Sequence, residues 1–569
     1  MLFCAMNYAR SSAPALPDFF FNILVTVGIV LNALGLFSLI MEPDGALYAT
    51  IAKTVAESGD FVNLIVEDRD WLDKPHFPFW VAAISYKIFG INSFAYKFPA
   101  FLFFLGSVWY TYQFALLAYS RLVAQISTLV MLTALHLVIS NNDVRAEPYL
   151  TAQVIGAVFH FFRLYRSDRP LDLVLGALWT GMALMTKGPF VVVPIGAGLF
   201  IHIVLTGQWR EFLQLRWYLA IVLSLLFCLP ELYTLYLQFD LHPEKVVFGK
   251  TGNSGIRFFF WDSQFGRFFN TGPIKGSGEK TFFLHTTLWA FAPWALLLYA
   301  AVGRAVLRLI GRIPYLPEYV SLGSGLMTFL LFSLSGFQLP HYLNIVFPFY
   351  AVLTAHFLTT LRNNVTHRRW LRTIQIQYQL LLVIVGGLIW YFRPQPMAGA
   401  IIWAVLVTVV TAVLARGRWL TALVGWAVGS SVLALGFYNL FLYPQLMPYQ
   451  AGGEAAFYIN EHNTPEQPGG MRLAGMYVED QYSFEFYLKQ RAYYWRTKAD
   501  LKAVADKEPV WILTSPTHLD TLRQDGWRVA PIDTFNFFHV TKLTGEFLNH
   551  QTRAQTLKPK VLAEVRSRP

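Results

Sequence analysis

Two carboxylates lie where the chain enters or leaves strongly apolar stretches. Asp44 directly follows the first long apolar run, and Glu147 precedes another one, in the segment 143–148. A carboxylate held where lipid head groups meet water is suited to act as a general base on a hydroxyl group. Alternatives stay open for both residues. Asp44 would otherwise be a solvated charge that ends a span, and Glu147, followed by Pro148, would otherwise be an acid favoured by the helix dipole.

Three basic residues stand beside other apolar stretches. Lys74 lies in Leu72-Asp73-Lys74-Pro75, Arg267 follows an aromatic run, and Lys187 precedes a Gly-Pro pair. Charge-assisted hydrogen bonds from such cations bind phosphate oxygens strongly, so Lys74 and Arg267 are candidate phosphate ligands. The alternatives are surface charges or an ion pair of Asp73 with Lys74. Lys187 is explained as well by snorkelling at the end of a span as by anion binding.

A tyrosine in a short turn is the last candidate. Tyr342 ends the segment 338–342, where its phenol would face a phosphate or form part of the interfacial aromatic belt. Two further motifs are rejected. Asp68-Arg69-Asp70 has a metal-binding spacing but lies on the side of the membrane that lacks nucleotides. Gly249-Lys250-Thr251 lacks the upstream glycine and the preceding strand of a phosphate loop.

The composition shows what must position these residues. Of 569 residues, 55% are hydrophobic and 14% are charged, whereas a soluble protein carries roughly 25% charge. A membrane-spanning helix needs about 20 apolar residues, and about thirteen stretches are candidates by this measure. The two cysteines, Cys4 and Cys228, give no disulfide framework. The predicted spans are 19–41, 98–118, 121–140, 149–165, 171–186, 189–206, 217–237, 283–303, 318–336, 343–361, 373–391, 398–415 and 420–441.

The charge distribution predicts the topology. The net charge is +11, but the arginines cluster between alternate spans, which is the positive-inside pattern and argues against nucleic-acid binding. We therefore predict a cytoplasmic N-terminus and, with an odd number of spans, a C-terminus on the outer side. Asp44, Glu147, Lys74, Arg267 and Tyr342 then all lie on the outer face.

The chain divides into a membrane domain, a smaller outer domain and a tail. Residues 1–445 form the predicted membrane domain, with long outer loops at 42–98 and 239–282. The first loop contains a predicted surface helix at 46–57 and, at 77–91, a second helix that is either interfacial or short and re-entrant. Residues 446–548 alternate strand-like and helix-like runs, as in a small α/β domain. We expect residues 549–569 to be a basic, disordered tail.

These motifs, in their order, resemble the group of protein O-mannosyltransferases and lipid A aminoarabinose transferases, which are GT-C membrane glycosyltransferases. The resemblance covers roughly residues 20–350, and the span count with the C-terminal domain looks most like the aminoarabinose transferase branch. The motifs that carry it are Asp44 with Tyr48, Ile51-Ala52, Ser58-Gly59-Asp60, Asp73-Lys74-Pro75, Thr186-Lys187-Gly188, Phe260-Trp261, Arg267-Phe268, Leu339-Pro340 and Tyr342.

The resemblance implies an activity and a set of roles. It implies a GT-C fold and an inverting glycosyltransferase that uses a polyprenyl-phosphate sugar, undecaprenyl in bacteria, on the outer face of the bacterial inner membrane. The acceptor would be a lipid A-type molecule, a glycan or a protein. By this analogy Asp44 is the base or orients the acceptor, and Glu147 is the second carboxylate. Lys74 and Arg267 bind the departing phosphate with help from Tyr342.

The resemblance also raises the question of a metal. In the aminoarabinose branch a divalent metal is associated with a carboxylate and a histidine. Asp73 is the candidate carboxylate here, but Gln264 stands where the histidine is expected. The competing function classes are a multi-span secondary transporter and a flippase of the cell envelope. Transporters usually carry mid-membrane ionisable groups and internal repeats, whereas these charges gather at the outer boundary.

Overall fold

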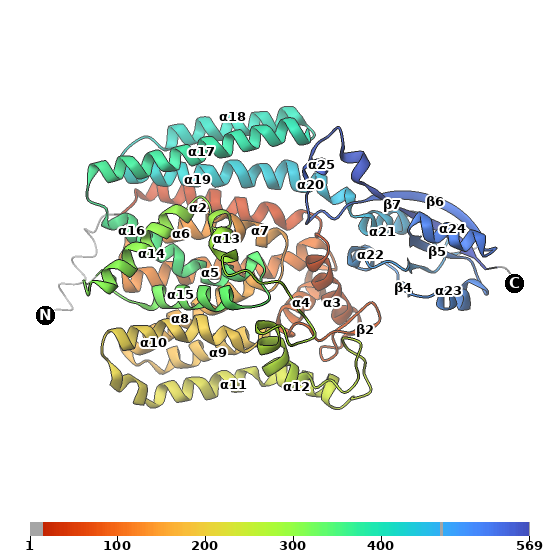
Figure 1. Ribbon diagram of the computed structural model, residues 1–569, viewed down its shortest axis with the longest axis horizontal. Helices are drawn as coiled ribbons and strands as arrows, with labels where there is room; N and C mark the ends of the chain where they lie inside the picture. Colours follow the sequence, from red (N-terminus) through yellow and green to blue (C-terminus); the bar gives the residue numbers. More distant parts are fainter. Residues whose placement is uncertain (1–14, 314, 467–469, 568–569) are drawn as a thin grey trace.

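The computed structural model describes residues 15–313, 315–466 and 470–567, so Cys4 and the first residues of the predicted membrane domain lie outside the described part. Long helices, roughly parallel to one another, form a bundle, and a smaller α/β unit stands at one end of it (Figure 1). The helices of the bundle are α2 Asp18–Ala33, α5 Ser93–Ala118, α6 Arg121–Thr133, α7 Leu135–Asn142, α8 Glu147–Ser167, α9 Pro170–Lys187, α10 Val192–Leu205, α11 Leu215–Leu235, α13 Phe282–Ala290, α14 Ala295–Ile310, α15 Val320–Leu334, α16 Phe347–Thr360, α17 Asn364–Phe392, α18 Met397–Leu414 and α19 Trp419–Phe437.

The protein crosses the membrane several times. Among the described residues, seven helices are long and apolar enough to span a bilayer, and an eighth is obtained if α6 and α7, bent by 49°, count as one span. The count of thirteen spans therefore stays a prediction. The single span expected at 283–303 is wrong, since this stretch forms two helices, α13 and α14. Pro293 lies between them, and proline has no N–H to continue a helical ladder.

The first outer loop contains the helices that the sequence predicts. The helix predicted at 46–57 is α3, which runs over Asp44–Ser58, and the helix predicted at 77–91 is α4, which runs over Phe77–Phe89. Between them lies a short hairpin of β1 Ile65–Val66 and β2 Arg69–Asp70. The second long loop contains α12 Gly255–Arg257 and the π-helical segment η5 Phe258–Gly266. A 3-10 helix, η6 Pro340–Val346, leads into α16.

The C-terminal unit is a three-layer α/β arrangement. Its five strands lie in the order β4-β3-β5-β7-β6; β3 pairs in parallel with β4 and β5, and β7 runs antiparallel to both β5 and β6. The strands are β3 Ala474–Tyr477, β4 Ala492–Trp495, β5 Val510–Thr514, β6 Arg528–Phe537 and β7 Lys558–Arg566. Helices α21 Ala451–His462 and α22 Tyr482–Tyr487 supply buried side chains to one apolar cluster on the sheet, and α23 Lys498–Ala505 and α24 Pro516–Gln524 supply them to another.

The predicted disordered tail at 549–569 is wrong, because residues 553–556 form a 3-10 helix and a strand follows it. Residues 558–566 form β7, an inner strand of the sheet. Basic residues at the two ends of this strand made it look like a disordered extension. Its middle, however, contains Leu562, Ala563 and Val565, which are all fully buried. A strand covered on both faces has no alternating pattern to reveal it.

Hydrogen bonds between α22 and α3 hold the C-terminal unit against the start of the membrane domain. The Lys53 ammonium donates to the carbonyl oxygens of Glu485 and Leu488, each at 2.7 Å, and Thr50 Oγ1 donates to the Tyr482 carbonyl at 3.0 Å. Helix α3, which begins at Asp44, is therefore held by the C-terminal unit.

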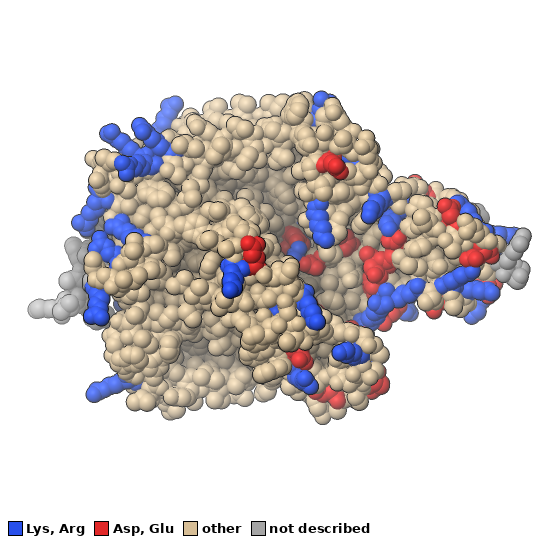
Figure 2. Space-filling model, viewed as in Figure 1, with Lys and Arg blue, Asp and Glu red and all other residues tan. Residues whose placement is uncertain are grey.

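Charged side chains occupy the two ends of the molecule. On the face seen in Figure 2, lysines and arginines gather at the end of the bundle farthest from the C-terminal unit, and most acidic side chains lie on that unit and the neighbouring loops. The surface between them is almost free of charge on this face, as expected for a belt that faces lipid.

Candidate functional site

A cavity of about 370 Å³ lies where α9, α11, η5 and the loop before α4 meet. Its wall is largely apolar and includes Phe190, Phe332 and Phe337, but it also contains Asp73, Lys74, Lys187, Arg267 and Tyr342. These five residues come from four separate stretches of the chain. All of them except Asp73, the candidate metal ligand, were predicted as phosphate ligands.

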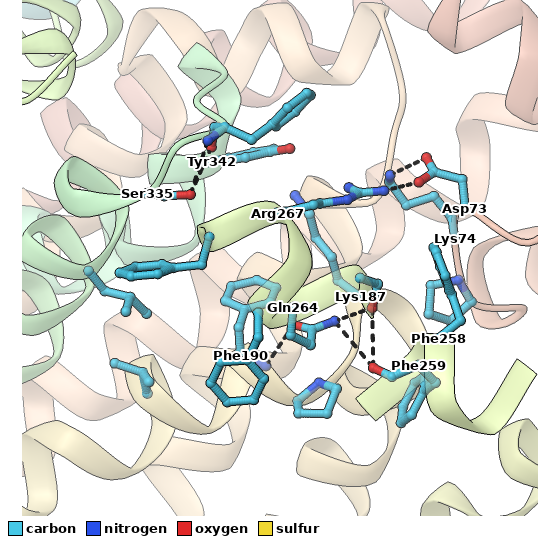
Figure 3. A pocket seen from close by; sticks show the side chains of 18 of the residues that line it. Asp73, Lys74, Lys187, Phe190, Phe258, Phe259, Gln264, Arg267, Ser335 and Tyr342 are labelled. Atoms are coloured by element: carbon cyan, nitrogen blue, oxygen red, sulfur yellow. Dashed lines mark hydrogen bonds and ion pairs between the residues drawn. The ribbon is translucent and has the colours of Figure 1, made fainter. Parts of the chain in front are cut away.

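Asp73, in the loop before α4, forms ion pairs with both Lys74 and Arg267 (Figure 3). Its Oδ2 atom accepts from Lys74 Nζ at 2.5 Å, and its Oδ1 atom pairs with the Arg267 guanidinium. The side chains of Asp73, Lys74 and Arg267 are only 17%, 14% and 14% exposed. An ammonium has three donors and a guanidinium five, so both cations keep donors beyond those that Asp73 uses. The predicted ion pair of Asp73 and Lys74 thus exists, and it lies in the cavity wall.

A second ion pair, between Glu147 and Lys187, adjoins the cavity. Glu147, at the first position of α8, pairs with Lys187, the last residue of α9, and its Oε1 atom lies 3.7 Å from His341 Nε2. Lys187 Nζ lies 4.0 Å from the ring centroid of Tyr342, a cation–π contact. Glu147 does not line the cavity itself but is linked to it through Lys187.

Tight packing fixes the end of α9 next to the cavity. Gly188 follows Lys187 with φ +88°, a conformation that glycine adopts without strain. A Cβ atom on Gly188 would lie 2.5 Å from Gln264 Nε2. Gln264 therefore packs against the α9 terminus, and its Oε1 atom accepts from the Phe190 N–H at 3.3 Å.

Asp44 lies in a separate charge cluster. Its Oδ2 atom is 2.6 Å from Arg145 Nη1, while Arg145 Nη2 donates to Asp143 at 2.7 Å. Burial disfavours the charge on Arg145, but Asp143 and Asp44 outweigh this effect and raise its pKa. Asp44 is 41% exposed and does not line the cavity. The carboxylate is therefore oriented by an arginine and remains accessible.

Tyr48 lies within the field of both charge clusters. Burial raises its pKa to about 12; the positive charges of Lys74 and Arg145 act in the opposite direction, and Glu147 and Asp44 add to the rise. Tyr48 is one helical turn after Asp44 on α3, so it faces the same side of that helix. Charges from both clusters therefore act on the same buried tyrosine.

The residues do not support a metal at Asp73. Across residues 15–313, 315–466 and 470–567, no group of three or more His, Cys, Asp or Glu side chains is placed to hold a metal ion. Both oxygens of Asp73 are taken by cations, and the expected histidine is Gln264. A divalent cation needs several oxygen or nitrogen ligands, which these residues do not supply.

Sequence reasoning missed several groups near the site. Arg145 was noticed only as part of the Glu147 segment, and His341 only as part of the turn before Tyr342. Glu231 lines the cavity but lies inside a predicted apolar span, at 217–237. An ionisable residue within a span is the signal that would have found it. The rejected Asp68 and Asp70 form ion pairs with Arg491 and Lys245 instead.

Comparison with known sequences gives distant relatives. The family model of dolichyl-phosphate-mannose-protein mannosyltransferases matches residues 73–233. An undecaprenyl phosphate-alpha-4-amino-4-deoxy-L-arabinose arabinosyl transferase of Enterobacter sp. (strain 638) is 24% identical over 371 residues, covering 63% of this chain and 64% of the relative. The protein of that name from Erwinia tasmaniensis is 27% identical over 367 residues, covering 62% and 60%. This chain thus matches less than two thirds of the length of these relatives.

Comparison with solved structures extends over nearly the whole chain. The crystal structure of ArnT from Cupriavidus metallidurans bound to undecaprenyl phosphate matches with a TM-score of 0.71 at 18% identity, covering 96% of this chain and 97% of that one. The oligosaccharyltransferase of Archaeoglobus fulgidus in its apo form matches with a TM-score of 0.53 at 12% identity, covering 88% and 70%. The fold is therefore that of the GT-C membrane glycosyltransferases. Within that class, the predicted resemblance to the protein O-mannosyltransferase and aminoarabinose transferase group is confirmed.

Proposed function

We propose that this protein transfers a sugar from a polyprenyl phosphate, of the undecaprenyl type, to an acceptor at the outer face of the bacterial inner membrane. The observation that carries this proposal is the cavity in which Lys74, Arg267, Lys187 and Tyr342 meet among apolar side chains. A phosphate on a long hydrocarbon chain needs this combination of cations and apolar wall. The sequence relatives and the fold support the same activity.

Lys74 and Arg267 would act on the leaving group. As the bond between the anomeric carbon and the phosphate oxygen breaks, its electron pair passes to that oxygen and negative charge develops there. Preorganised cations in a largely dry cavity stabilise such charge better than water does. Asp73 holds both cations in place before the donor arrives. Tyr342 and Lys187 extend the same wall.

Asp44 would act on the acceptor. An acceptor hydroxyl attacks the anomeric carbon from the side opposite the phosphate, which inverts the configuration, and its proton passes to the Asp44 carboxylate. Arg145 directs that carboxylate through the ion pair between them. If the acceptor is a phosphate group of lipid A, it is already ionised, and Asp44 then orients it. The same geometry serves a glycan or protein hydroxyl. Glu147 would hold Lys187 at the cavity.

The orientation in the membrane belongs to the same proposal. We infer that the C-terminal unit lies in the periplasm, with the N-terminus in the cytoplasm. The gathering of lysines and arginines at the end of the bundle opposite that unit supports this orientation (Figure 2). The site then opens at the outer boundary, where a lipid-linked donor presents its head group.

Purified protein in lipid nanodiscs tests the proposal. Lys74→Ala should reduce binding of undecaprenyl phosphate, and Asp44→Asn should abolish sugar transfer from the native donor pool while leaving that binding unchanged. Lys250→Ala, at an exposed lysine of the second outer loop, is the control for removing a positive charge. Mass spectrometry of lipids, glycans and proteins from a strain that lacks the protein identifies the sugar and the acceptor. Normal transfer in both site variants would refute the assignment, and substrate flux across liposomes without transfer would favour a transporter.

A further inference from the structure

A buried acid–imidazole pair forms part of the cavity wall directly beside Lys74. Glu231 lines the cavity, and His76 is two residues after Lys74. The Glu231 side chain is 0% exposed and the His76 side chain 1% exposed. Glu231 lies in α11, one of the helices long enough to span the membrane. A charged group at such a place is costly unless it is compensated.

His76 binds both oxygens of Glu231. The His76 backbone N–H donates to Glu231 Oε2 at 2.9 Å, and the imidazole Nδ1 lies 3.1 Å from Glu231 Oε1. The other ring nitrogen, Nε2, lies 2.9 Å from the carbonyl oxygen of Val62. A carbonyl oxygen only accepts, so Nε2 must carry a hydrogen.

This arrangement fixes the charge of the pair as a unit. With Nε2 protonated, a hydrogen bond between Nδ1 and Glu231 Oε1 needs one further proton, because each atom otherwise offers only a lone pair. The Thr234 hydroxyl faces the same ring nitrogen at 3.4 Å. If His76 holds the further proton, an imidazolium faces a carboxylate; if Glu231 holds it, both groups are neutral. In either case His76 and Glu231 together carry no net charge.

The pair also fixes the backbone that carries Lys74. His76 precedes the first residue of α4, and its backbone and ring are anchored to α11 and to Val62. Asp73, Lys74 and Pro75 directly precede this anchored residue and line the cavity, so the anchor at His76 restricts where their backbone can lie. Arg267 pairs with Asp73, so the position of the second cation depends on the same anchor.

We propose that His76 and Glu231 are positioning residues that act on the phosphate through Lys74 and through charge compensation. The pair anchors the Asp73–Lys74 segment, and the imidazole neutralises a carboxylate that would otherwise repel a phosphate from the cavity wall. The inference rests on the proposed function, because it assumes that a phosphate binds between Lys74 and Arg267.

Substitutions that change only the charge balance test this proposal. His76→Gln removes the basic group that shares a proton with Glu231, so Glu231 loses its compensating partner. Binding of undecaprenyl phosphate should then weaken by about tenfold or more, since a bare charge acts strongly in a poorly solvated site. His76→Gln combined with Glu231→Gln removes both groups as charges and should restore binding to within about threefold of the wild type. Binding of undecaprenol, which has no phosphate, should be unchanged in all variants, whereas a general packing defect would weaken both ligands.

A matched control is available on the surface. His242 and Glu244 form an exposed pair, with Nδ1 2.9 Å from Oε1 and side chains 50% and 70% exposed. His242→Gln should leave both affinities unchanged, because water screens the remaining carboxylate.

The outcomes separate this inference from the proposed function. If Lys74→Ala leaves undecaprenyl phosphate binding unchanged, the phosphate site itself is refuted. If Lys74→Ala weakens binding but His76→Gln does not, or if the double variant is as weak as His76→Gln, the compensation is refuted. Failure of His76→Gln alone to fold, with recovery in the double variant, supports compensation. Failure of both to fold shows that the pair serves packing and overturns the inference.

Discussion

The stability of the junction between α3 and the C-terminal unit should depend on pH through Glu42. This residue lies two positions before Asp44, and its carboxylate accepts a hydrogen bond from the Ser483 N–H. Burial raises the pKa of Glu42 from 4.5 to about 7; the hydrogen bond with Ser483 opposes the rise, and the charges of Glu67 and Asp44 add to it. The protonated form is therefore favoured in the folded protein.

The sign and size of the effect follow from linkage. Between pH 4.5 and 7 the folded protein binds more protons at Glu42 than the unfolded chain does, so the free energy of unfolding falls as pH rises through this window. Each pKa unit corresponds to about 1.4 kcal/mol, which gives a loss of about 3 kcal/mol on passing from pH 4.5 to above pH 7. The full contribution is present below the unfolded pKa and is lost above the folded one.

Glu42→Gln provides the test, because glutamine keeps an acceptor oxygen for Ser483 but does not ionise. We expect the variant to be more stable than the wild type at pH 8 by as much as about 3 kcal/mol, and to lose this advantage near pH 4.5. The measurement is the unfolding temperature of the purified protein in detergent, recorded from pH 4.5 to 8. Glu57→Gln, at an exposed carboxylate near the C-terminal end of α3, should run parallel to the wild type. If the curve for Glu42→Gln also ran parallel to that of the wild type, the raised pKa of Glu42 in the folded protein would be refuted.

Three further substitutions test other parts of the structure. Lys187→Met should destabilise the protein by about 3–5 kcal/mol because it leaves the carboxylate of Glu147 buried without its partner. Adding Glu147→Gln should recover most of that loss in thermal unfolding, and no recovery would contradict the pairing. Arg145→Met should lower the turnover of sugar transfer far more than it lowers the affinity for undecaprenyl phosphate, because Arg145 orients Asp44; equal losses would contradict this role. Lys53→Met should cost about 1.5–3 kcal/mol, because charged hydrogen bonds to carbonyl oxygens at the end of α22 are lost, and unchanged unfolding would contradict that contact.

The sequence predicted those parts of the fold that depend on local pattern. Apolar length located the helices of the bundle, and the helical spacing after residue 44 located α3 to within two residues at its start. Patterns that depend on neighbours were missed. The strand β7 is buried by its partners and not by its own alternation, and the break at Pro293 divides a stretch that looks continuous in composition.

Of the predicted site residues, the structure places Lys74, Lys187, Arg267 and Tyr342 around one cavity and Asp44 and Glu147 outside its lining; the contacts among them were not predicted. Lys74, Arg267 and Tyr342 come from three distant stretches, and they were linked by motif order and by placement on one side of the membrane. No local pattern indicates that Glu147 reaches Lys187, because that contact is set by the packing of α8 on α9. Glu231 illustrates the same limit: its partner lies 155 residues away, so only the three-dimensional arrangement connects it with the Lys74 loop.

The strand order of the C-terminal unit has a consequence for how the protein is made. Because β7 lies between β5 and β6, the sheet lacks an inner strand until residues 558–566 have been synthesised. Domains generally assemble in the order of synthesis. Here the helices of the bundle are made before β7, so the sheet on which α22 packs is completed only after them. A chain truncated before residue 558 would leave β5 and β6 without the strand that joins them, and both would carry an unpaired β-edge open to association with other chains.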